Sequence, residues 1–266
     1  MTTVITAPAL NGTELGTGNF RILYANLFDT ATTVVASSED PDFPIENISD
    51  WLPQDYFAPA ASGAYTITCT FANAQTANCM AWYNQNLSDN GGSIQLQYWD
   101  GALWQDASDN VSPSSNDPRV VYFTAQASTQ WRFNIVSTPA SSIGVLFFGE
   151  YLGLELGIRN GFTPPRFSSN NNYISNVSQN GNFIGRSIVS QSGNISIPVD
   201  YMTDQWARDN WETFITHAEK KPFFFSWNVA DYPNEHAFAW STDKAFSTKN
   251  QTFNRMQSTI KVRVIA

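Results

Sequence analysis

The sequence predicts a mainly β protein: an N-terminal β-sandwich jelly roll followed by a second β-rich domain that carries one amphipathic helix. The composition is aromatic (14%) and poor in charge (14%), and several short segments alternate apolar with polar residues, as half-buried strands do. The charge also changes along the chain. Residues 1–153 hold three arginines and no lysine against fourteen acidic residues, whereas the remainder holds eleven basic residues against nine acidic ones.

This change of charge sets the expected domain boundaries. Residues 1–18 are Thr, Gly, Ala and Pro with little that can pack, so they are expected to form an extended arm. Residues 19–153 are assigned to the acidic jelly roll and 154–266 to the second domain. A length of 266 residues suffices for two cores, and a cut near residue 153 is expected to give two domains that fold independently.

In the first domain, apolar residues alternate with threonines from Tyr65 to Phe71, which indicates a half-buried strand. Two turn-forming residues, Asp100 and Gly101, separate the alternating run at 94–98 from Leu103 and Trp104, which predicts a β-hairpin. About eight such strands within some 130 residues favour a sandwich or jelly roll. The segment 43–51 is expected to be a loop or a single helical turn.

In the second domain, Asn180-Gly181 lies at the predicted turn of a hairpin that starts near Tyr173. The period then becomes helical near 203–220, where Thr203 is the expected N-cap and Lys220-Lys221-Pro222 the stop. The run Phe223-Phe-Phe-Ser-Trp227 is apolar without alternation, so it is expected to be a strand covered on both faces.

Several functions are disfavoured. The acidic first domain lacks the clustered basic residues that bind nucleic acid, and no apolar run reaches the roughly 18 residues of a membrane span. The N-terminus has no secretion signal, so the chain is expected to stay in the cytosol with Cys69 and Cys79 as buried thiols. His217 and His236 are expected at the surface. With these as the only histidines, no catalytic residues, no zinc site and no enzymatic activity are expected.

Two groups of residues are candidate sites. Loop aromatics can stack on a sugar, but they also fill cores and interfaces: Trp51, Tyr56, Tyr83, Trp99 and Trp104. Three loop carboxylates could ligate calcium, namely Glu39, Asp40 and Asp42. They lack the residue spacing of a calcium-binding loop, and they are also consistent with an ordinary solvated loop. No other cofactor is expected.

Five segments together resemble discoidin-like, galactose-binding-like jelly rolls: Ser37 to Trp51, Ala64 to Phe71, Ala77-Asn-Cys-Met-Ala-Trp-Tyr-Asn-Gln-Asn-Leu87, Ile94-Gln-Leu-Gln-Tyr98 and Trp131-Arg-Phe-Asn-Ile135. The sequence departs from ligand-binding discoidin domains because it lacks the disulfide that joins the domain ends and has few arginines in its loops.

The whole arrangement, with Phe147-Phe-Gly-Glu-Tyr-Leu152, Pro222-Phe-Phe-Phe-Ser-Trp227 and Asp231-Tyr-Pro-Asn-Glu235, resembles distal tail or baseplate structural proteins of tailed bacteriophages. That resemblance implies a virion component at the tail tip, assembled in the host cytoplasm from other tail proteins and copies of itself. A homo-oligomeric ring is expected, with six copies favoured over three. The alternative is an adhesin whose jelly roll binds host-surface glycans through Trp51, Tyr56, Trp99 and Trp104.

Overall fold

The computed structural model describes residues 19–156, 158, 161–168, 172–243 and 246–266. The expected arm at 1–18 therefore lies outside the described residues. Within them the protein is mainly β, as the sequence predicts, with one helix of substantial length. The strands are β1 (Arg21–Leu23), β2 (Thr33–Ala36), β3 (Gly63–Gln85), β4 (Ser93–Trp99), β5 (Trp104–Asp106), β6 (Arg119–Ser137), β7 (Ile143–Gly149), β8 (Leu152–Gly153), β9 (Asn172–Val177), β10 (Phe183–Ser190), β11 (Gly193–Thr203), β12 (Phe223–Ser226), β13 (His236–Ser241), β14 (Thr248–Thr252) and β15 (Arg255–Ile265).

Two long strands, β3 and β6, build the jelly roll. The sheet runs β2-β3-β6-β4-β5, and β7 pairs with the second half of β3. The register between β3 and β6 shifts between Thr70 and Gln75 and again between Ala77 and Cys79. Such irregularities bend a strand. The first half of β3 thereby pairs in one layer with β2 and the second half in the other layer with β7, and the apolar core lies between them.

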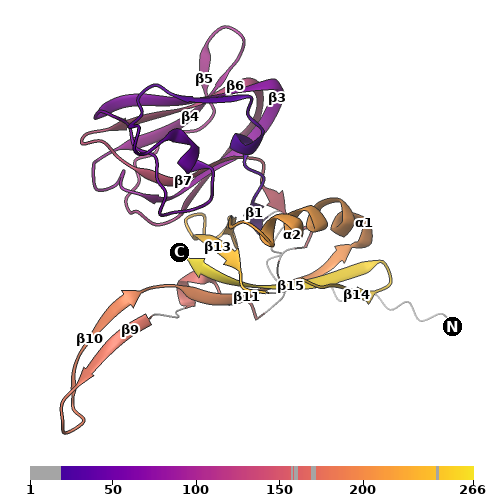
Figure 1. Cartoon of the computed structure of the whole chain (residues 1–266). Helices are drawn as coiled ribbons and strands as arrows, with labels where there is room; N and C mark the ends of the chain where they lie inside the picture. Colours follow the sequence, from indigo (N-terminus) through magenta and orange to yellow (C-terminus); the bar gives the residue numbers. More distant parts are fainter. Residues whose placement is uncertain (1–18, 157, 159–160, 169–171, 244–245) are drawn as a thin grey trace, which may run out of the picture.

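The second sheet has the order β11-β15-β13-β12-β1-β8, with β14 paired to β15 (Figure 1). A continuous helix, α1 (Asp204–Trp206), the π-helical turn η4 (Ala207–Trp211) and α2 (Glu212–Ala218), covers one face. The Thr203 hydroxyl accepts a hydrogen bond from the Trp206 amide, so the expected N-cap is confirmed. Phe214 packs edge-on against Phe223, with ring centroids 5.0 Å apart.

The expected boundary at residue 19 differs from the structure. β1 pairs with β12 on one side and β8 on the other, so Arg21–Leu23 belongs to the second sheet. The jelly roll is thus inserted between two neighbouring strands of that sheet. A three-residue strand has no period of its own that identifies its partners, and its partners here lie about 130 and 200 residues further along the chain.

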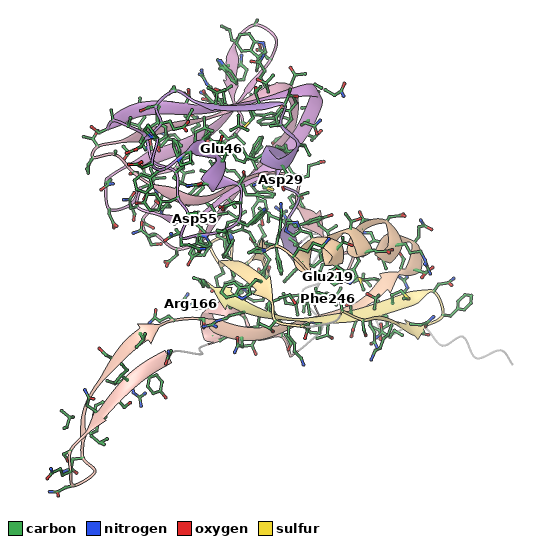
Figure 2. All side chains as sticks on the ribbon, viewed as in Figure 1. Asp29, Glu46, Asp55, Arg166, Glu219 and Phe246 are labelled. Atoms are coloured by element: carbon green, nitrogen blue, oxygen red, sulfur yellow. The ribbon has the colours of Figure 1, made fainter. Side chains whose placement is uncertain are left out.

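The two parts share a buried core. Phe223 and Phe225 face the helix, whereas Phe224 faces the jelly roll and packs with Phe147 and Trp51. β12 is therefore covered on both faces, as its continuous apolar run predicts. At the rim of this contact, Lys221 Nζ lies 3.1 Å from Asp29 Oδ2. Figure 2 shows side chains filling the space where the jelly roll meets the sheet.

Candidate binding surfaces

The four aromatic candidates for sugar binding separate into different environments. Trp51 is 1% exposed and lies in the core shared by the two parts, with its ring 6.0 Å from those of Phe147 and Phe224. A sugar cannot stack on it there. Tyr56 is half-buried and stacks on Phe43 at 4.5 Å, so one of its faces is occupied. No periodicity in the sequence indicates that the loop around Trp51 is folded inward.

Trp99 and Trp104 lie together on the outer face of the jelly roll. They are partners across the β4–β5 hairpin, both are half-buried, and their ring centroids are 5.5 Å apart. The Arg132 guanidinium lies 4.4 Å from the centroid of Trp104 and donates through Nε to Gln97. Gln97 in turn donates to Asp106, which completes an ordered polar and aromatic surface.

The three calcium candidates do not converge. Asp40 Oδ1 accepts a hydrogen bond from the Asp42 amide, which ties the carboxylate into its own loop. Among the residues that the structure describes, no three His, Cys, Asp or Glu side chains come together in a way that could hold a metal ion. Cys69 and Cys79 are buried free thiols, and burial raises the pKa of both. Within the described ranges, no helix is long and apolar enough to cross a membrane.

The expectation that both histidines lie at the surface is wrong for His236. Strand β13 carries His236 inward, where it is 4% exposed and bonds through Nδ1 to Ser226 Oγ at 2.8 Å. Ser226 Oγ also accepts a hydrogen bond from the Tyr122 hydroxyl, so Tyr122, Ser226 and His236 form one buried chain of polar side chains. Burial and the nearby Arg119 lower the pKa of His236 to about 3, which keeps it neutral.

The hairpin β9–β10 is the most unusual surface of the molecule. It projects away from the second sheet, and among the described residues no neighbouring element lies across its side chains (Figures 1 and 2). We call this hairpin the projecting hairpin. Seven large apolar residues on it are exposed to between 46% and 68%: Tyr173, Ile174, Val177, Phe183, Ile184, Ile188 and Val189. A soluble monomer rarely exposes so much contiguous apolar surface.

No family model and no curated protein matches this sequence. Solved structures similar to it include a pectin-binding carbohydrate-binding module (17% identity, 44% of this chain and 89% of that chain, TM-score 0.38). They also include a Clostridium perfringens CBM32 module in complex with GalNAc-β-1,3-galactose (14%, 52% and 99%, TM-score 0.39) and the CBM32 of AlyQ in complex with 4,5-unsaturated mannuronic acid (25%, 44% and 94%, TM-score 0.36). Nothing in these comparisons shows a bacteriophage tail or baseplate origin.

Proposed function

We propose that this protein is a repeating subunit of a larger assembly, in which the projecting hairpin of one copy docks on the second sheet of the next copy. The observation that carries the proposal is the exposed apolar surface of the hairpin. A two-stranded hairpin is marginally stable by itself in water. Seven of its large apolar side chains are exposed to solvent. The hairpin therefore gains stability and buries this apolar surface only when it packs against a partner.

The opposite end of the same sheet offers a matching surface. Phe253, at the turn between β14 and β15, is 88% exposed, and Tyr201 on the neighbouring stretch of β11 is 51% exposed. The two lie at the same end of the sheet, because the Tyr201 carbonyl accepts from Arg255 and its amide donates to Gln251, which lie on either side of Phe253 in the chain. Figure 1 places the projecting hairpin at one end of the sheet and β14 at the other. We call Tyr201 and Phe253 the distal apolar pair.

Contact between unlike ends of identical subunits is heterologous, and it closes into a ring when the rotation per copy divides a full turn. A ring at the tail tip of a bacteriophage, with six copies favoured over three, is the assembly that the sequence resemblance implies. The jelly roll is inserted between β1 and β8, and in Figure 1 it lies away from the tip of the projecting hairpin and from β14. It would therefore be displayed on such a ring without interrupting the contact.

The double substitution Val177→Ser with Phe183→Ser is expected to reduce self-association. These residues are partners across the hairpin, 62% and 68% exposed, so the change removes apolar contact without disturbing a core. If both are central to the contact, association weakens by about a hundredfold or more. Sedimentation over a range of concentrations measures this against the 29.6 kDa monomer.

Leu103→Ser is the matched control because Leu103 is equally exposed, at 66%, but lies in the β4–β5 turn of the jelly roll. It should leave the sedimentation profile unchanged. An unsubstituted protein that stays monomeric at the highest soluble concentration would contradict docking between copies. An oligomer that the double substitution leaves intact would contradict the role of the hairpin.

A second function, glycan binding by the jelly roll, is favoured by the arrangement of Trp99, Trp104 and Arg132. Two half-buried indoles beside an ordered Arg, Gln and Asp offer stacking surface together with hydrogen bonds for sugar hydroxyls. Trp99→Ala should abolish binding on a glycan array while leaving the melting temperature nearly unchanged, because the ring lies outside the cores. Leu103→Ala is the neighbouring control. If the unsubstituted protein binds no glycan on the array, this second function is rejected.

A further inference from the structure

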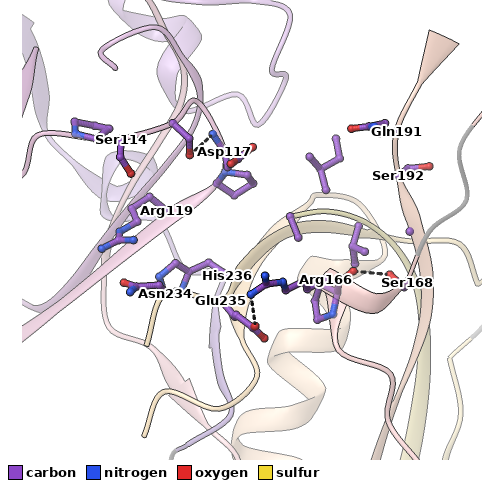
Figure 3. A pocket seen from close by; sticks show the side chains of 18 of the residues that line it. Ser114, Asp117, Arg119, Arg166, Ser168, Gln191, Ser192, Asn234, Glu235 and His236 are labelled. Carbon is purple, nitrogen blue, oxygen red and sulfur yellow. Dashed lines mark hydrogen bonds and ion pairs between the residues drawn. The ribbon is translucent and has the colours of Figure 1, made fainter. Parts of the chain in front are cut away.

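A cleft of about 550 Å³ lies where the jelly roll meets the base of the projecting hairpin (Figure 3). One wall is the loop that precedes β6, at residues 111–119. The other walls are the short 3₁₀ turn η3 (Pro165–Phe167), the connection from β10 to β11, the residues before β13, and the end of β15. The volume is within the range of about 300–1,000 Å³ that small-molecule pockets occupy. Both parts of the fold therefore contribute to one open cleft.

Hydroxyl and amide side chains dominate the polar lining, and they come from segments far apart in the sequence: Ser112, Ser114, Ser168, Gln191 and Asn234. Each can both donate and accept hydrogen bonds. Three prolines supply rigid apolar surface between them: Pro113, Pro118 and Pro165. A ligand that fits must present many hydroxyl groups as donors and acceptors, together with some apolar carbon surface.

The charged side chains of the cleft balance in sign. They are Arg119, Arg166, Asp117 and Glu235, two of each charge. Arg166 Nη1 is 3.7 Å from Glu235 Oε1, and its side chain is 74% exposed, so this pair is weak. Glu235 is fixed instead by Trp227, whose Nε1 donates to Oε2 at 2.7 Å. A balanced set of charges favours a neutral polar ligand over an anion or a cation.

One donor group at the cleft lacks an acceptor within the described part of the chain. The Arg119 guanidinium makes no hydrogen bond to any residue that the structure describes, although it is half-buried. The wall behind it is held by hydrogen bonds that join Tyr122 to Ser226 and Ser226 to His236, and these connect the jelly roll to β12 and β13. An unsatisfied donor on a rigid wall favours a ligand that supplies oxygen acceptors.

We propose that this cleft binds a neutral pyranose sugar, with Arg119 donating to its hydroxyl oxygens and Glu235 accepting from its hydroxyl groups. The site is separate from the face of Trp99 and Trp104 and from the docking contact of the projecting hairpin. Short peptides are disfavoured as ligands because the lining offers many hydroxyl groups and few large apolar pockets for anchoring side chains.

Calorimetry on the full chain tests the proposal with three neutral probes: methyl β-D-galactopyranoside, methyl α-D-glucopyranoside and N-acetylglucosamine. At least one should bind saturably. Arg119→Gln and Glu235→Gln should each weaken binding about tenfold or more, since hydrogen bonds to charged groups are among the stronger ones. Arg166→Gln is a third variant. Arg166 also lines the cleft, and its exposed side chain does not support folding, so this change should weaken sugar binding as well.

Arg208→Gln is the control, because Arg208 pairs with Asp204 on the exposed side of the helix. Trp99→Ala should also leave this binding unchanged, which separates the cleft from the glycan-binding face of the jelly roll. Glucuronate is the anionic comparison probe. The proposal is overturned if no neutral probe binds saturably or if only glucuronate binds. It is also overturned if the Arg119, Glu235 and Arg166 variants bind the neutral probe as tightly as the unsubstituted protein does. Loss of binding in Trp99→Ala would move the site to the outer face and also overturn it.

Discussion

Trp51→Ala is expected to lower the free energy of unfolding by about 3–5 kcal/mol, the usual cost of removing a large buried aromatic ring. Trp51 is 1% exposed and contacts both parts of the fold through Phe147 and Phe224. It also lies 5.4 Å from His217, between ring centroids, at the end of the helix. The substitution would therefore leave a cavity in the shared core, and the surrounding atoms could fill it only in part.

Leu52→Ala is the matched control for this experiment, because Leu52 is the next residue and is 45% exposed. It should change the free energy of unfolding by about 0.5 kcal/mol or less. Chemical denaturation followed by circular dichroism measures both variants. If Trp51→Ala costs no more than Leu52→Ala, Trp51 does not support the contact between the jelly roll and the second sheet.

A cut at residue 153 is expected to leave residues 154–266 without a cooperative melting transition. The fragment would lose β1 and β8, so β12 would become an edge strand with its apolar residues unprotected. Phe224 and Phe238, both buried in the shared core, would face water. This expectation replaces the two independent domains that the change of charge near residue 153 suggests.

The comparison fragment joins residues 19–24 to 150–266 through a short Gly-Ser connection. β1 and β8 are adjacent, with Ile22 opposite Leu152, so a short connection can replace the jelly roll. Restoring both strands should recover a cooperative transition in calorimetry. A cooperative transition for residues 154–266 alone would show that β1 and β8 are dispensable for this sheet.

The sequence predicts those features that local patterns encode. Alternation identifies the strand around Ile67, the Thr203 cap identifies the start of the helix, and Gly181, with φ of +79°, lies in the hairpin turn that Asn180-Gly181 indicates. The continuous run Phe223–Phe225 correctly indicates a strand buried on both faces, because alternation disappears when both faces meet a core.

Features that depend on distant pairing are not encoded locally. The position of β1 depends on partners in β8 and β12, and no local pattern selects one sheet over the other. Trp51 has a φ of +67° in a loop, so no periodicity shows which way its ring points. The apolar residues of the projecting hairpin have the pattern of an ordinary half-buried hairpin, and only the fold shows that no other described element covers them. Sequence analysis does not predict the cleft, because five separate segments of the chain form it.

Disulfide formation between copies tests the docking contact most directly. Cys69 and Cys79 are buried, so introduced cysteines are the reactive ones. Two variants are prepared, Ile184→Cys on the projecting hairpin and Phe253→Cys in the distal apolar pair, both at exposed positions. The account predicts that oxidation of a mixture links the first variant to the second, while each variant alone remains largely unlinked. Equal linking of Ile184→Cys chains to one another, or no linking in the mixture, would contradict docking of the hairpin on the opposite end of the next subunit.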